Sequence, residues 1–139
     1  MQFSLKSLLI AIPIAAMAVW YFDSLNVIKA DGGDTLKIEI ECSDPDVTRI
    51  SYATARSDFL EYVDGYYPMP ETQFETADTD IITVRLPWSI TATQSGRTLH
   101  YIETFDSILF RVKCEGRGPK YHIFRIPNKK DRAELKVVL

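Results

Sequence analysis

Residue types that commonly carry out catalysis are scarce in this sequence. His100 and His122 are the only histidines among 139 residues, and neither has a second nitrogen or sulfur ligand at the short spacing of zinc sites. Ser89 and Ser95 lie in PWSITATQSG, which lacks the nucleophile elbow of serine hydrolases. No catalytic residue, metal or cofactor is therefore predicted. A small hydrolase that pairs one histidine with a carboxylate is a secondary alternative.

Paired aspartates recur between the apolar segments. Clustered loop carboxylates are common ligands of calcium. The chain offers Asp44 with Asp46 and Asp78 with Asp80, but neither pair has the spacing of an EF-hand loop. Aspartate is also an ordinary turn residue. These four are the positions at which calcium would be tested, and turn formation is the favoured interpretation.

Aromatic side chains gather in and near one segment that is expected to be a loop. Tyr62, Tyr66 and Tyr67 belong to EYVDGYYPMP, and Trp88 follows later in the chain. Exposed loop aromatics commonly bind sugars or peptides. These four residues are therefore candidates for ligand binding. The alternative is that the rings cover an edge of the domain.

Alternation of apolar and polar residues dominates the chain from Thr35 onward. In TLKIEIEC every second side chain from Leu36 to Cys42 is apolar, as in a half-buried strand. Similar patterns predict seven strands, at residues 35–42, 47–54, 80–86, 97–105, 107–114, 120–126 and 133–139. The expected fold class is all-β, an antiparallel β-sandwich that occupies residues 35–139 as one domain. The stretch SDFLEYVDG fits either a helical turn or an edge strand.

The two cysteines, Cys42 and Cys114, fall on the apolar phase of their predicted strands. Both side chains are therefore expected to point into the same core. In an exported domain such a pair should oxidise, so a Cys42–Cys114 disulfide is predicted. In a cytosolic domain the two residues would instead be free, buried thiols.

Residues 1–22 are expected to be a signal-anchor or a signal peptide, and their apolar stretch, 3–22, is long enough to cross a bilayer. Trp20, Tyr21 and Phe22 form an aromatic cluster where the membrane interface would lie. Lys6 near the start of the stretch and Asp23 just after it predict a cytoplasmic amino terminus and an exported domain. Residues 23–34 are expected to be a tether that ends in a turn at the two adjacent glycines.

A signal peptide is the alternative interpretation of the same residues. Ala16-Met17-Ala18 has the small-x-small pattern of a cleavage site. Cleavage after Ala18 would leave Val-Trp-Tyr-Phe as an exposed apolar start to the mature chain. Retention as a signal-anchor is therefore favoured, and both interpretations export the domain.

The opening FSLKSLLIAI resembles that of small membrane-anchored bacterial proteins that begin F-S-L-[KR]-x-L-L. It is also similar to the start of type IV pilins, but Gln2 and Ser7 stand where pilins have glycine and glutamate. The two cysteines on an early and a late strand resemble the immunoglobulin-like architecture. That family's tyrosine two residues before the second cysteine is replaced here by Val112. The first resemblance implies a location in the bacterial inner membrane, with the carboxy-terminal domain in the periplasm.

Composition gives no sign of a nucleic-acid partner. The net charge is −3, and the basic run PNKKDR lacks interleaved aromatic residues. The interpretation is therefore a membrane-tethered, extracytoplasmic module that binds or scaffolds another envelope protein or a glycan. The alternative is a secreted carbohydrate- or protein-binding module released by cleavage after Ala18.

Overall fold

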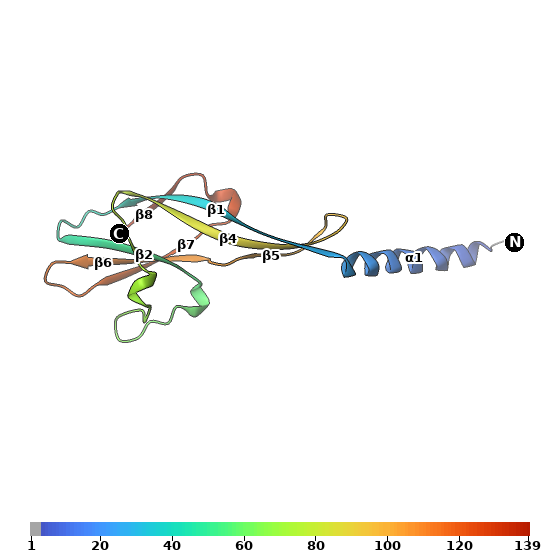
Figure 1. Ribbon diagram of the computed structural model, residues 1–139, viewed down its shortest axis with the longest axis horizontal. Helices are drawn as coiled ribbons and strands as arrows, with labels where there is room; N and C mark the ends of the chain where they lie inside the picture. The colour runs from blue at the N-terminus through green and yellow to red at the C-terminus, as the bar shows by residue number, and fades with distance from the viewer. Residues whose placement is uncertain (1–3) are drawn as a thin grey trace. The chain divides into compact units, whose positions relative to one another are not determined.

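The computed structural model describes residues 4–139. The segment 1–3, and with it the expected first residue of the membrane span, lies outside the described residues. One helix precedes eight strands in the described chain (Figure 1). The elements are α1 (Leu5–Leu25), β1 (Val27–Glu41), β2 (Val47–Ala55), β3 (Glu75–Thr76), β4 (Ile81–Thr93), β5 (Thr98–Glu103), β6 (Ser107–Cys114), β7 (Lys120–Arg125) and β8 (Leu135–Val138), with 3₁₀ turns η1 (Ser57–Phe59), η2 (Glu71–Gln73) and η3 (Lys129–Asp131).

The strands form two four-stranded sheets, an arrangement consistent with a β-sandwich. Sheet A has the order β5-β4-β1-β8, and sheet B has the order β3-β2-β6-β7. Sheet B is antiparallel throughout, whereas β8 runs parallel to β1, with Ile38 opposite Leu135 and Ile40 opposite Val137. The expectation of seven antiparallel strands is therefore corrected to eight strands with a mixed sheet A.

The core lies between the two sheets and follows the predicted alternation. Every second residue is buried from Leu36 to Ile40 in β1 and from Ile82 to Leu86 in β4. These side chains face apolar residues of β2 and β6 in sheet B, and Val137 of β8 adds to them from sheet A. A fully buried side chain of this kind contributes about 1.5–3 kcal/mol relative to an exposed one. The cluster comprises Leu36, Ile38, Ile40, Tyr52, Ile82, Val84, Leu86, Ile108, Phe110 and Val137.

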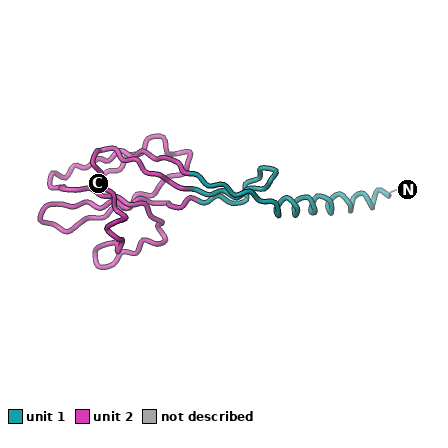
Figure 2. The backbone as a smooth tube through the Cα atoms, in the orientation of Figure 1, with its two compact units in different colours: residues 1–32, 88–102 teal, residues 33–87, 103–139 magenta. Residues whose placement is uncertain are grey.

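The chain divides into two compact units (Figure 2). Unit 1 contains residues 1–32 and 88–102, and unit 2 contains residues 33–87 and 103–139. The core belongs to unit 2. Strands β1 and β4 contribute residues to both units, since each is longer than the sequence pattern predicted.

The segment 23–34, expected to be a tether, consists of the end of α1 and the first part of β1. Its two glycines lie inside a strand and form no turn. A Cβ added to Gly32 would collide with the indole ring of Trp88, and one added to Gly33 would lie 2.8 Å from Nε of Arg85. These glycines allow large side chains of β4 to approach the backbone of β1 closely.

Both cysteines are free thiols in the structure, so the expected disulfide is absent from it. Cys42 is half-buried one residue beyond the end of β1 in sheet A, whereas Cys114 is buried at the end of β6 in sheet B. The Cys114 thiol lies 4.0 Å from Oδ2 of Asp44. The alternation of apolar and polar residues correctly predicted that Cys114 is buried. It did not predict which atoms lie near the Cys114 sulfur.

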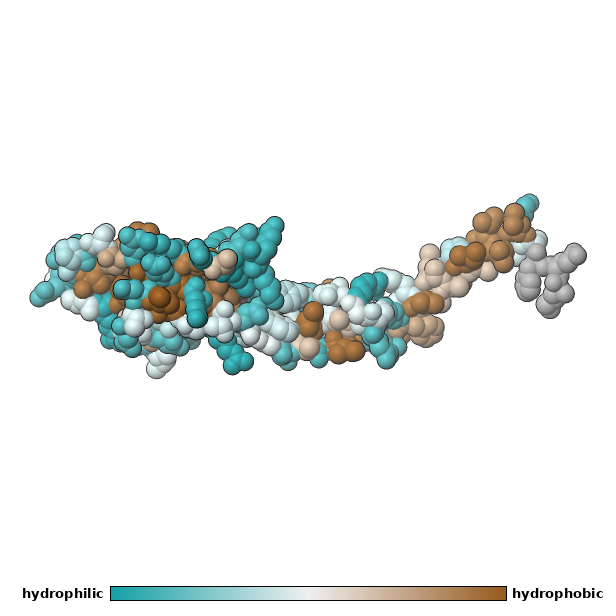
Figure 3. Space-filling model, turned by 90° about the horizontal axis from the view of Figure 1, so that it is seen from above, coloured by the Kyte–Doolittle hydropathy of each residue, from teal (hydrophilic) through white to brown (hydrophobic). Residues whose placement is uncertain are grey.

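Helix α1 is long and apolar enough to cross a membrane, and hydrophobic residues cover much of the face seen in Figure 3. None of its side chains is buried. The side chain of Ser4 caps its first turn by accepting the N–H of Ser7 at 3.2 Å. Pro13 lies inside the helix, and the helix continues past it to Leu25. A signal-anchor and a signal peptide both meet this description.

Candidate functional site

The connection between β2 and β3, residues 56–74, is the longest non-strand segment within unit 2. We call it the 56–74 loop. Loops of this length in a compact domain usually have a function when they are ordered. Its order arises from polar contacts at its two ends, which attach it to sheet B.

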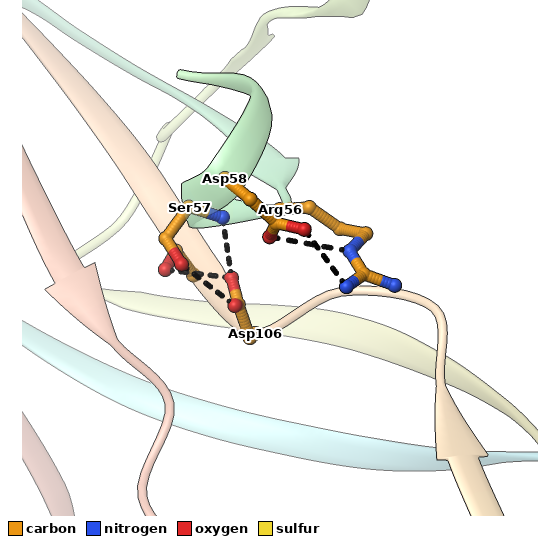
Figure 4. A network of polar contacts seen from close by, with 5 residues as sticks. Arg56, Ser57, Asp58 and Asp106 are labelled. Carbon is orange, nitrogen blue, oxygen red and sulfur yellow. Dashed lines mark hydrogen bonds and ion pairs between the residues drawn. The ribbon is translucent and has the colours of Figure 1, made fainter. Parts of the chain in front are cut away.

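The first end is attached by a hub at Asp106 (Figure 4). The backbone N–H of Ser57 donates to Oδ1 of Asp106 at 2.7 Å, and the Ser57 hydroxyl donates to Oδ2 at 2.7 Å. The Ser107 hydroxyl donates to Oδ1 at 2.9 Å. Burial would raise the pKa of Asp106, but the hydrogen bonds from Ser57 and Ser107 outweigh it and lower that pKa. The hub therefore joins the start of the loop to the β5–β6 junction.

Arg56 adds a second local contact at the same end. Its Nη2 lies 3.0 Å from Oδ2 of Asp58, and its guanidinium carbon lies 5.8 Å from the ring centroid of Phe59. The hydrogen bond from Arg56 lowers the pKa of Asp58. Arg56 thus forms an exposed ion pair with a residue of η1 (Figure 4).

The second end is attached through Arg111 of β6. Its two terminal nitrogens donate to both carboxylate oxygens of Glu71, at 2.6 and 2.7 Å. Its guanidinium carbon also lies 4.0 Å from the ring centroid of Phe74. The hydrogen bonds with Arg111 lower the pKa of Glu71, and the same bonds raise that of Arg111. Arg111 is only 6% exposed. Its buried charge is neutralised by Glu71 and lies against the ring of Phe74.

A further bond follows directly after the loop. The Tyr52 hydroxyl donates to Oε2 of Glu75 at 2.9 Å. Burial, together with this hydrogen bond, raises the pKa of Tyr52 to about 12. Tyr52 therefore stays protonated and attaches β3 to the core.

The 56–74 loop covers the face of sheet B that lies opposite the core. Ile108 and Phe110 point into the core, so the alternate residues Leu109 and Arg111 point outward, yet both are buried. Arg111 is in contact with the loop through Glu71 and Phe74. Strand β6 is consequently buried on both faces.

Between the loop and the sheet lies a pocket of about 410 Å³. Such a volume is within the range of small-ligand sites. The lining is mostly apolar, with the charged side chains of Arg56 and Glu61 among it. Phe59 contributes a ring that is 79% exposed. The lining residues are Thr54, Ala55, Arg56, Phe59, Leu60, Glu61, Tyr67, Pro68, Met69, Pro70, Gln73, Thr104 and Phe105.

The tyrosines expected to bind a ligand lie on the same loop. The Tyr62 and Tyr67 rings are 5.0 Å apart, and Tyr67 makes an edge contact with Tyr121 of β7 at 5.6 Å. Tyr62 and Tyr66 are 60% and 48% exposed. Trp88 is placed differently: it belongs to unit 1, where its ring lies 6.1 Å from that of Tyr101. Three of the four candidate aromatics therefore share the loop.

A tight turn orients these tyrosines. Val63 and Tyr66 exchange backbone hydrogen bonds of 2.9 and 3.0 Å across Asp64-Gly65. Asp64 and Gly65 have φ values of 48° and 88°, the left-handed conformation that two-residue hairpins require. The SDFLEYVDG segment is thus a 3₁₀ turn followed by a two-residue turn.

The four aspartates proposed as calcium ligands lie in two different places: one pair contacts an arginine, and the other pair lines a small pocket. Asp44 and Asp46 both pair with Nη2 of Arg117, at 3.7 and 2.6 Å. Asp78 and Asp80 line a smaller pocket of about 150 Å³ beside Cys42. Within residues 4–139 no group of three or more histidine, cysteine, aspartate or glutamate side chains could hold a metal.

The two histidines lie apart from the pocket. His100 is exposed on β5 in unit 1, and His122 is exposed on β7 in unit 2. Neither lines the pocket beside the 56–74 loop. The geometry expected of a histidine-based hydrolase is therefore not assembled there.

Sequence reasoning missed the residues that build the site. Arg111, Glu71 and Asp106 attach the loop, and Phe59 and Met69 line the pocket. An available signal was Arg111 itself, which interrupts the otherwise apolar run ILFRV. A charged residue in a central strand requires a partner when it is buried. The Asp-Gly pair was a second signal, since it is typical of a two-residue turn.

No protein-family model, curated protein or solved structure matches this chain.

Proposed function

We propose that this chain is a membrane-tethered binding module whose extracytoplasmic domain recognises a partner through the 56–74 loop. The observation that carries the proposal is the pocket of about 410 Å³ between this loop and sheet B. Loops attached firmly to a β-sandwich are a frequent location of recognition sites. The resemblance to immunoglobulin-like domains supports the proposal only because their recognition sites also lie on loops of a β-sandwich.

The tether in this proposal is α1. Its 21 residues, at about 1.5 Å per residue, match a hydrocarbon thickness of about 30 Å. The helix has no buried side chain, and a lipid environment would remove this apolar surface from water. The flanking charges favour an amino terminus in the cytoplasm and an exported domain. The bacterial periplasm as the location of that domain follows from the resemblance of the opening residues alone.

The expected partner is another envelope protein that inserts an apolar side chain into the pocket. Phe59, Leu60 and Met69 supply apolar surface in an open pocket, and a partner side chain that fills it would remove this surface from water. The hydrogen bonds at Asp106 and Arg111 hold the pocket in shape before binding. Pre-organisation of this kind reduces the entropic cost of association.

A secreted, glycan-binding module is the second candidate. The exposed rings of Tyr62 and Tyr66 favour it, because sugars stack on such surfaces. Cleavage after Ala18 would release the domain. Mass spectrometry of the mature amino terminus separates retention from release.

Site-specific photo-crosslinking in intact cells tests the binding site. A photoreactive phenylalanine at Leu60 or Met69, both in the pocket lining, should form a discrete adduct with one protein. The same residue at Lys120, exposed on β7, is the matched control and should form none. Equal adducts at all three positions would contradict the proposal. Adducts with glycan and none with protein would favour the second candidate.

A further inference from the structure

The turn between β4 and β5 in unit 1 packs against the last part of α1. The Ser95 hydroxyl donates to Oδ2 of Asp23 at 2.8 Å, and the Gln94 N–H donates to the carbonyl of Asn26 at 3.0 Å. The guanidinium carbon of Arg97 lies 5.5 Å from the ring centroid of Trp20. We call residues 93–97 the hairpin tip. Three separate contacts therefore join it to the carboxy-terminal end of the helix.

The hairpin tip has a defined internal structure. Thr93 and Arg97 are joined by a 2.8 Å backbone hydrogen bond, and the buried Thr93 hydroxyl also accepts the Arg97 N–H at 3.0 Å. Gly96 has a φ of 94°, which favours glycine at this point of the turn. The position of Arg97 relative to Trp20 is thus determined by the turn itself.

Arg97 forms no salt bridge with any residue of the described chain. The Asp23 carboxylate accepts its hydrogen bond from Ser95. Arg97 is exposed. Its guanidinium stacks on the aromatic face of Trp20, and its charge also attracts the nearby Asp23 carboxylate without forming an ion pair with it. Such stacking leaves the edge of the guanidinium available for a second, anionic partner.

If α1 spans the bilayer, Trp20 lies near the membrane interface, where tryptophan is enriched. Arg97, in contact with Trp20, then lies at the level of the lipid phosphates. Guanidinium binds phosphate oxygens in a bidentate manner. We infer that the hairpin tip is a membrane-surface contact in which Arg97 binds the phosphate of a phospholipid headgroup in the extracytoplasmic leaflet. This inference rests on the proposed tether.

A lipid-bound hairpin tip would also fix the position of the carboxy-terminal end of α1. A tip that binds both the headgroup layer and the end of α1 holds the emerging chain at the membrane surface. Asp23, which is costly to place in hydrocarbon, is hydrogen-bonded to Ser95 at the same level. The hairpin tip therefore also defines where the span ends.

Collision accessibility of a nitroxide label tests the inference in vesicles of phosphatidylcholine containing phosphatidylglycerol. The full chain carries Cys42→Ser, and the buried Cys114 is retained. Labels are placed by Ala15→Cys in α1, Gln94→Cys in the hairpin tip and Lys130→Cys in η3. Ala15 should be accessible to oxygen in the lipid, and Lys130 to a water-soluble nickel chelate. Gln94 should give an intermediate value.

Charge reversal then tests the role of Arg97. Arg97→Glu should shift the Gln94 label toward the accessibility of Lys130, whereas Arg97→Lys should retain most of the wild-type value. Arg125→Glu, the same change at an exposed position of β7, should leave the Gln94 label unchanged. Circular dichroism confirms that each variant is folded.

The outcomes separate this inference from the proposed function. An Ala15 label that is accessible to water would overturn the tether. With Ala15 in lipid, a Gln94 label as accessible to the chelate as Lys130, or one unmoved by Arg97→Glu, would overturn the lipid contact alone. An Arg97-dependent change on adding inorganic phosphate without lipid would assign a free phosphate ligand and also overturn the contact.

Discussion

Arg111 and Glu71 are joined by two parallel hydrogen bonds of 2.6 and 2.7 Å, although they lie 40 residues apart in the chain. The guanidinium comes from the central strand β6, and the carboxylate comes from the 56–74 loop. This pair closes the loop over the outer face of sheet B. Pro70 and Gln73, which lie close to Glu71 in the chain, line the pocket that carries the proposed function.

Glu71→Gln should lower the free energy of unfolding at neutral pH, because a buried guanidinium loses its charged partner. The pKa of Glu71 is lowered from 4.5, so its contribution is complete above that value and is lost as the pH falls through the lowered pKa. Urea unfolding at a series of pH values measures the effect. The difference between wild type and variant should shrink in acid, and a difference independent of pH would contradict the pairing.

Ser57→Ala should weaken the attachment of the loop at Asp106. It removes the 2.7 Å bond from the Ser57 hydroxyl and leaves the bond from the backbone N–H in place. We expect a loss of about 0.5–1.5 kcal/mol in urea unfolding. Ser89→Ala, at a serine without such a contact to Asp106, is the control. Equal losses in the two variants would show that the hub has no special role.

Phe59→Ala should separate binding from stability. The ring is 79% exposed, so its removal should change the free energy of unfolding by less than about 1 kcal/mol. Phe110→Ala, at a core residue that is 0% exposed, should cost about 3–5 kcal/mol. Loss of the Leu60 photo-adduct in Phe59→Ala, with the unfolding transition retained, is the expected result. A large loss of stability would mean that Phe59 is structural.

The cysteines provide a test of the thiol state. Two free thiols predict two reactive groups per chain in denaturant. In the folded protein the half-buried Cys42 should react with an aromatic disulfide reagent faster than the buried Cys114. The protein must be isolated from its own membrane without added reductant and with air excluded, so that the native thiol state is retained. No reactive thiol in denaturant would show that the two residues are oxidised, as their phase in the sequence predicted.

Local patterns in the sequence predicted the strands and the core well. The alternation around Ile38 and Phe110 identified core residues, and β6 has the predicted bounds, Ser107–Cys114. Such patterns report which face of a strand is buried. They do not report which strand lies beside it, so the parallel pairing of β1 with β8 was not predicted.

Long-range contacts account for the remaining differences. Gly32 and Gly33 resemble a turn in sequence, but the residues that require their small size, Trp88 and Arg85, come more than fifty positions later in the chain. Arg111 resembles a surface residue until the loop that carries Glu71 folds over it. The sequence drew attention to the loop through its tyrosines. The residues that attach the loop to sheet B have partners far away in the chain, which the alternation of apolar and polar residues does not reveal.

The account as a whole rests on a retained helix that holds the domain at a membrane. The most direct measurement is the intact mass of the chain recovered from its native membrane after extraction at alkaline pH. We predict a chain of 15.9 kDa in the membrane pellet, with residues 4–25 present. A soluble chain that begins at Val19 would contradict the tether and favour the secreted module.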